Sequence, residues 1–201
     1  MKRRFLALGD SYTLGEGIPE QQSWPVQLVN ALNASGIAFK PPTVIAQTGW
    51  TTDELAKAIN ASTLCKNFDL ASLLIGVNNQ YRSRPLKDFE KELAELLKIA
   101  IGFAGGDPRR VFVVSIPDWS VTPFANGRDR AKIAREIDEF NIVTKRQAEK
   151  QQVRFINVTG ISRHAEANPD LLASDGLHPS ADMYALWVQR MLPTITEKLR
   201  S

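Results

Sequence analysis

The 201-residue sequence contains one cysteine, two histidines and no long apolar run. Cys65 cannot form an intrachain disulfide, and we expect it to be a buried, unreactive thiol. A structural zinc site needs several clustered cysteine or histidine ligands, which this composition excludes. No stretch approaches the roughly 20 apolar residues of a membrane span, and the apolar run at 5–8 is too short for a signal peptide. The sequence therefore predicts a cytoplasmic protein with no integral membrane segment.

An excess of charge of one sign is also absent. The 25 Lys and Arg residues oppose 22 Asp and Glu residues, which gives a net charge of +3. The basic residues are scattered, whereas nucleic-acid-binding proteins concentrate them on one face. We therefore expect no nucleic-acid partner. No pattern predicts an oligomeric state, because the aromatic stripe near the end of the chain, with Tyr184 and Trp187, is more typical of a core than of an interface.

Apolar runs and helical patterns alternate along the chain. The apolar runs lie at 4–9, 42–47, 68–76, 109–117 and 153–159. Apolar residues at helical spacing lie within 23–32, 87–101, 133–143 and 181–199. Strands that alternate with helices form parallel sheets covered on both faces. The pattern predicts one domain over 1–201, with an α/β fold in which a five-stranded parallel sheet is the middle layer of a three-layer α/β/α sandwich.

The segment that follows the first apolar run is Gly9-Asp10-Ser11, with further glycines at 15 and 17. Ligands of parallel sheets bind beyond the carboxyl ends of the strands, so this loop is a candidate site. Glu16 stands where a P-loop would need a lysine, which excludes that motif. The hydroxyls and glycines still allow a flavodoxin-like loop that binds FMN. The side chain of Asp10 is expected to anchor the loop by accepting backbone N–H bonds.

A nucleophilic serine is the alternative that finds more support elsewhere in the chain. Ser11 would need a base, and the base would need an orienting partner. His178 follows Asp175 by three residues, so one turn can bring the carboxylate to Nδ1 and leave Nε2 for Ser11. His164 lies in a segment that resembles a surface loop or short helix. We therefore predict Ser11, His178 and Asp175 as the catalytic residues.

Hydrolysis of an acyl group also needs donors for the oxyanion of the tetrahedral intermediate. Gly49 follows the second apolar run and can present a backbone N–H. Asn78 follows the third run and can present a side-chain amide. The backbone N–H of Ser11 would be the third donor, although Gly49 could also be a plain turn and Asn78 a helix cap.

Together these residues resemble the SGNH hydrolase family, also known as GDSL esterases and lipases. Gly9-Asp10-Ser11, Gly49, Gly76-x-Asn78 and Asp175-x-x-His178 occur in the order of the four family blocks. The resemblance implies a flavodoxin-like SGNH hydrolase fold, the catalytic and oxyanion roles given above, and no metal or other cofactor. Two departures are Tyr12, where many members have leucine, and Asn79, where many have aspartate.

The same resemblance implies a small-molecule acyl ester as substrate, such as a short-chain ester, a lysophospholipid or an acetylated sugar. The loops after the third and fourth runs are expected to line the substrate pocket through Asn79, Tyr81, Arg82 and Trp119. Two alternatives to a serine esterase stay open at this point. One is a ligand-binding relative without turnover, and the other is the flavodoxin-like FMN protein.

Overall fold

All five apolar runs form strands of one sheet in the computed structural model, which describes residues 2–200. The sheet order is β2-β1-β3-β4-β5, and every neighbouring pair is parallel. The strands are β1 Phe5–Asp10, β2 Thr43–Gln47, β3 Leu70–Leu74, β4 Val111–Val114 and β5 Arg154–Ile156. This order is that of the flavodoxin-like doubly wound fold, which confirms the predicted fold class.

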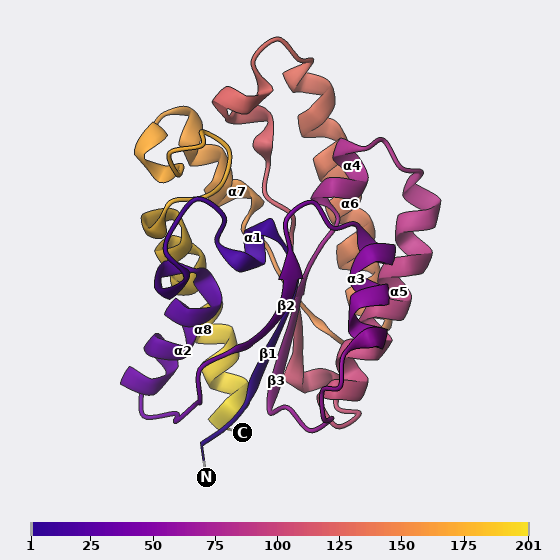
Figure 1. Ribbon diagram of the computed structural model, residues 1–201, viewed down its shortest axis with the longest axis vertical. Helices are drawn as coiled ribbons and strands as arrows, with labels where there is room; N and C mark the ends of the chain where they lie inside the picture. The colour runs from indigo at the N-terminus through magenta and orange to yellow at the C-terminus, as the bar shows by residue number, and fades with distance from the viewer. Residues whose placement is uncertain (1, 201) are drawn as a thin grey trace.

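Long helices cover both faces of the sheet (Figure 1). One layer holds α2 Trp24–Ala34 and α8 Ala181–Arg200; the other holds α3 Thr52–Ala61, α5 Leu86–Phe103 and α6 Arg130–Lys150. In α2, Trp24, Leu28 and Leu32 recur every fourth residue and are completely buried. Spacing of this kind places the three side chains on one side of the helix, against the sheet. The apolar faces of the two layers and the sheet form the core.

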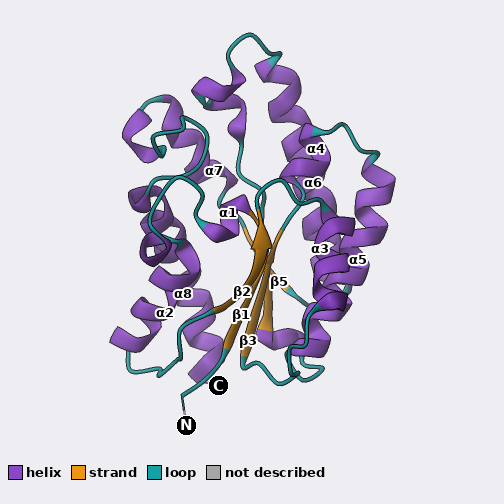
Figure 2. Ribbon diagram, viewed as in Figure 1, coloured by secondary structure: helices purple, strands orange, loops and turns teal. Residues whose placement is uncertain are grey.

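Short helices follow three of the strands. They are α1 Ser11–Leu14 after β1, α4 Val77–Tyr81 after β3 and α7 Thr159–Ser162 after β5. In Figure 2 the loops at the carboxyl end of the sheet lie beyond the strand arrowheads, among α1, α4 and α7. The remaining helical turns are of the 3₁₀ type: Glu20–Gln22, Pro108–Arg110, Trp119–Val121, Pro123–Ala125, Arg163–Glu166 and Pro169–Leu171. The sequence analysis did not predict α3, α4 or α7; α4 and α7 have only five and four residues, too few to show a helical period.

Cys65 is exposed, so the expectation of a buried thiol is wrong. It lies in the irregular connection between α3 and β3, outside the helical layers that supply the core. None of the helices within residues 2–200 combines the length and the apolar character needed to cross a bilayer.

Candidate active site

The turn after β1 explains why the first strand runs directly into Gly9-Asp10-Ser11. A Cβ atom on Gly9 would lie 2.1 Å from Oγ1 of Thr13 and 2.5 Å from the carbonyl oxygen of Leu74, so only glycine fits. Asp10 then caps α1, since its Oδ1 accepts the backbone N–H of Tyr12 at 3.0 Å. This confirms the predicted anchoring role of Asp10. Ser11 is thereby fixed as the first residue of α1, at the carboxyl end of β1.

Ser11, His178 and Asp175 form a hydrogen-bonded chain. The hydroxyl of Ser11 lies 2.9 Å from Nε2 of His178, and Nδ1 of His178 lies 2.6 Å from Oδ2 of Asp175. With Nδ1–H donating to the carboxylate, Nε2 is left to accept the proton of the hydroxyl. The structure thus brings together the three side chains that the sequence analysis singled out, although Ser11 and His178 are 167 positions apart. A serine in this arrangement can be deprotonated as it attacks an electrophile.

The loop that carries Asp175 and His178 is held at both ends by backbone bonds. The N–H of Ala173 donates to the carbonyl of His178 at 2.7 Å, and the N–H of Ser180 donates to that of Leu171 at 2.8 Å. Partial burial acts to raise the pKa of Asp175, but hydrogen bonds from the His178 ring and from the N–H groups of His178 and Leu177 outweigh it, so the pKa lies below its usual value. The carboxylate therefore stays ionised at neutral pH beside the imidazole.

Tyr12 also contacts the imidazole, a contact that the sequence analysis missed. Its ring is buried, and its centroid lies 4.9 Å from that of His178. The backbone carbonyl of Tyr12 also accepts the hydroxyl of Tyr184 in α8 at 2.9 Å. The residue that replaces the usual leucine therefore packs directly against the candidate base and restrains its ring.

The three candidate oxyanion donors follow adjacent strands, since β1 is flanked by β2 and β3: Ser11 begins α1, Gly49 lies in the turn after β2, and Asn78 lies in α4. Gly49 has a φ of 84°, a left-handed conformation that favours glycine. Asn78 donates from Nδ2 to the carbonyl of Trp50 at 3.0 Å. An amide has two N–H groups, so this bond leaves one of them for a ligand.

The four residues expected to line a substrate pocket have different environments. Tyr81 is 42% exposed. Asn79 is completely buried, where it accepts the backbone N–H of Thr52 and donates to its hydroxyl. Trp119 is also buried, with its indole N–H donating to Oε1 of Gln80. The substrate contacts of these residues stay predictions.

The guanidinium of Arg82 makes contacts within the protein. Its Nη2 donates to the carbonyl oxygen of Gly49 at 2.6 Å, and its Nη1 forms an ion pair with Glu54 at 3.3 Å.

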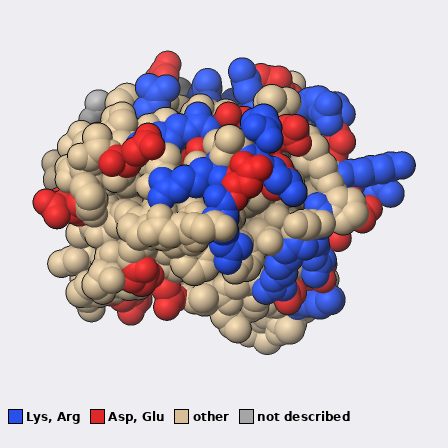
Figure 3. Space-filling model, turned by 90° about the horizontal axis from the view of Figure 1, so that it is seen from above, with Lys and Arg blue, Asp and Glu red and all other residues tan. Residues whose placement is uncertain are grey.

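Seen from the carboxyl ends of the strands, Lys and Arg are interleaved with Asp and Glu (Figure 3). Arg84 pairs with Asp53 at 2.8 Å in the same region. This end of the molecule is therefore not a concentrated basic surface.

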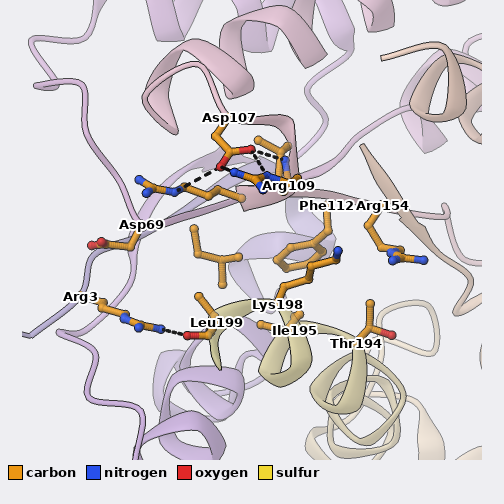
Figure 4. Close-up of a pocket in the computed structure, with 13 residues that line it drawn as sticks. Arg3, Asp69, Asp107, Arg109, Phe112, Arg154, Thr194, Ile195, Lys198 and Leu199 are labelled. Atoms are coloured by element: carbon orange, nitrogen blue, oxygen red, sulfur yellow. Dashed lines mark hydrogen bonds and ion pairs between the residues drawn. The ribbon is translucent and has the colours of Figure 1, made fainter. Parts of the chain in front are cut away.

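A cavity of about 390 Å³ lies at the opposite end of the sheet (Figure 4). Leu70, Val111 and Arg154, the first residues of β3, β4 and β5, line it. Arg3 donates to the carbonyl of Leu199 near the end of α8, a stabilising contact for a helix C-terminus, and Arg109 forms a bidentate pair with Asp107. The size of this cavity does not make it the candidate site, because it is remote from Ser11.

Within residues 2–200, no three His, Cys, Asp or Glu side chains are grouped so that they could hold a metal ion.

A parallel α/β fold with a linked serine, histidine and aspartate at the carboxyl end of its sheet has the architecture of a serine hydrolase. The model of the GDSL-like lipase/acylhydrolase family matches residues 7–186, and the chain belongs to that family. It is a hydrolase of ester bonds.

Individual relatives agree with this assignment. An arylesterase from Vibrio mimicus is 25% identical over 181 residues, which are 89% of this chain and 81% of the relative. The crystal structure of TesA superposes with a TM-score of 0.75 at 18% identity and covers 98% of this chain and 99% of its own. Axe2, an acetylxylan esterase from Geobacillus stearothermophilus, has a TM-score of 0.72 at 19% identity. The match covers 96% of this chain and 94% of Axe2. These neighbours show that the fold is that of the SGNH hydrolases.

Proposed function

We propose that the protein is a serine esterase that hydrolyses carboxylic esters through an acyl-enzyme on Ser11. The observation that carries this proposal is the 2.9 Å contact between the Ser11 hydroxyl and Nε2 of His178, whose other ring nitrogen is held by Asp175. A serine hydroxyl is inert at neutral pH without such a base. The geometry supplies the base and its orienting partner together.

In the proposed reaction, Oγ of Ser11 attacks the ester carbonyl as Nε2 of His178 takes its proton. Asp175 stabilises the imidazolium, while the N–H groups of Ser11 and Gly49 and the amide of Asn78 receive the oxyanion. The intermediate collapses when His178 returns the proton to the leaving alcohol. Water then attacks the acyl group with His178 again as base, which frees the carboxylate product and Ser11.

An aromatic surface beside the site supports small esters with an apolar or aryl group. Tyr81 and Phe124 are each about two-fifths exposed, and the guanidinium of Arg128 lies 5.0 Å and 5.3 Å from their ring centroids. This surface borders the loop of Asp175 and His178, because Pro123 lies 3.5 Å from the position of a Cβ on Gly176. The arylesterase relative favours short-chain aryl esters within the proposed range, which also includes lysophospholipids and acetylated sugars.

The FMN alternative has less support. Glu16 accepts a hydrogen bond from the hydroxyl of Thr48, which places a carboxylate in the loop that a phosphate would have to approach. A like charge at that position would repel the ligand.

The proposal is tested with Ser11→Ala. The variant should lose activity toward 4-nitrophenyl acetate by about 10⁴-fold or more, because the other groups cannot replace the nucleophile. His178→Ala should have a comparable effect, whereas His164→Ala, at the exposed second histidine, should retain full activity. Wild-type turnover in Ser11→Ala would contradict the proposal.

Labelling separates an esterase from a ligand-binding relative that has no turnover. A fluorophosphonate should add to Ser11 of the wild-type protein, as measured by intact-protein and peptide mass spectrometry. It should fail to label the Ser11→Ala variant. No adduct on the wild type would favour the non-catalytic alternative.

A further inference from the structure

We infer that Arg82 is a positioning residue for the reaction, because its guanidinium holds the carbonyl group of Gly49, the residue whose backbone N–H is the proposed oxyanion donor. The inference rests on the proposed function of the site. It assigns Arg82 a role different from the substrate contact expected from the sequence.

The contact between Arg82 and Gly49 is close and specific. Arg82 follows α4, and its Nη2 donates to the carbonyl oxygen of Gly49 at 2.6 Å. A Cβ atom on Gly49 would lie 3.4 Å from this nitrogen, so the guanidinium packs against the bare backbone of the glycine. A larger residue would both strain the φ of 84° and crowd the arginine.

Glu54 fixes the other arm of the guanidinium and connects it to the same loop. Nη1 of Arg82 lies 3.4 Å from Oε1 and 3.3 Å from Oε2 of Glu54. Oε2 also accepts the backbone N–H of Thr51 at 2.9 Å. Arg82 therefore contacts the loop directly at Gly49 and, through Glu54, at Thr51.

Residues of α4, together with Arg82 directly after it, bind three residues between β2 and the first turn of α3. Arg82 binds the carbonyl of Gly49, Asn78 binds that of Trp50, and Asn79 binds both the N–H and the hydroxyl of Thr52. Glycine is the most flexible residue, so the peptides on either side of its Cα would rotate readily without such contacts. An oxyanion hole is effective only when its donors are already oriented. The bond from Arg82 restrains the carbonyl side of Gly49 and, through its Cα, limits how far the donor N–H can turn.

A positioning role explains the contacts of Arg82 better than binding of an anionic substrate does. Both terminal nitrogens of the guanidinium already have protein partners, and one of them is the carboxylate of Glu54. Capture of a substrate anion would compete with that carboxylate. Tyr81, one residue earlier, is 42% exposed and presents an aromatic surface to a substrate.

The test compares Arg82→Ala with Arg84→Ala. Arg84 is a matched control, because it pairs with Asp53, the neighbour in α3 of the Glu54 that pairs with Arg82. No hydrogen bond joins Arg84 to Gly49 within the described residues. With neutral 4-nitrophenyl acetate, Arg82→Ala should lower kcat by about 10- to 100-fold and change KM by less than about twofold, a smaller loss than removal of an oxyanion donor itself. Arg84→Ala should keep kcat within about twofold of the wild type.

A tetrahedral inhibitor gives a second readout that a general loss of packing would not produce. Phenylboronic acid adds to a nucleophilic serine and presents a charged oxygen to the oxyanion donors. Its affinity should fall in Arg82→Ala by the same factor as kcat/KM. Arg82→Lys, which keeps one N–H donor within reach of Gly49, should recover part of both losses.

Three results would overturn the inference: a higher KM with unchanged kcat, equal losses in Arg82→Ala and Arg84→Ala, or a loss confined to anionic esters. If Arg82→Ala fails to fold, Arg82→Lys and Arg82→Gln are judged by the same criteria. Failure of the proposed function would look different, because the wild-type protein would then hydrolyse no ester or Ser11→Ala would remain active.

Discussion

At the scale of single residues, Asp10 has a demanding environment, because it is completely buried directly before the candidate nucleophile. Its Oδ1 accepts the N–H of Tyr12, whereas its Oδ2 has no hydrogen-bond partner within the described chain. Burial raises the pKa of Asp10 from 3.8 to about 7, although the backbone hydrogen bonds act in the opposite direction. Anchoring the nucleophile loop with a carboxyl group therefore costs stability once the solution is neutral or basic.

This environment predicts a pH-dependent effect of Asp10→Asn on stability. Between pH 3.8 and about 7 the folded protein holds a proton on Asp10 that the unfolded chain has released, so the stability of the wild type falls as pH rises through this window. Asparagine keeps an oxygen acceptor for Tyr12 and does not titrate. The melting temperature of Asp10→Asn relative to the wild type should therefore be higher at pH 8 than at pH 5. If the difference in melting temperature between Asp10→Asn and the wild type is the same at pH 5 and pH 8, the raised pKa of Asp10 is contradicted.

At the scale of elements, α4 explains why asparagine can replace the aspartate that many family members have. Asn79 donates from Nδ2 to the hydroxyl of Thr52 at 2.7 Å, and that hydroxyl donates in turn to Glu92 in α5. The amide of Asn79 donates a hydrogen bond to the Thr52 hydroxyl, so the proton of that hydroxyl remains free to be donated to Glu92. A carboxylate at position 79 would instead compete with Glu92 for the same proton.

We therefore expect Asn79→Asp to destabilise the protein by about 1–3 kcal/mol at pH 7, the typical cost of an unsatisfied buried polar group. The measurement is the free energy of unfolding in urea. Adding Glu92→Gln should restore most of the loss, because the competing carboxylate is then removed. A single variant as stable as the wild type, or a double variant no more stable than the single one, would contradict this account.

At the scale of the whole molecule, the strands and the candidate catalytic residues could be predicted because their signals are local. A strand such as β4 is a short apolar run, and Asp175 and His178 meet within one turn. The bond from Arg82 to Gly49 and the packing of Tyr12 on His178 could not be predicted. They depend on which short helix lies beside which loop, and α4, with five residues, is too short to show a period.

We propose that residues 1–201 form one cooperative domain, since the buried apolar residues of the described chain form one continuous cluster. Unfolding in urea should then give the same midpoint by far-ultraviolet circular dichroism and by tryptophan fluorescence. The fluorescence reports on Trp24 and Trp187 in one helical layer, and on Trp50 and Trp119 after β2 and β4. Two separate transitions would show that the layers unfold independently.

The wide separation of Ser11 and His178 along the chain has a consequence for biosynthesis. In a growing polypeptide, the serine is synthesised 167 positions before the imidazole that would activate it. Under the proposed mechanism, every truncated product that stops before position 178 is chemically inert. Ester hydrolysis would therefore begin only in copies that extend beyond the imidazole.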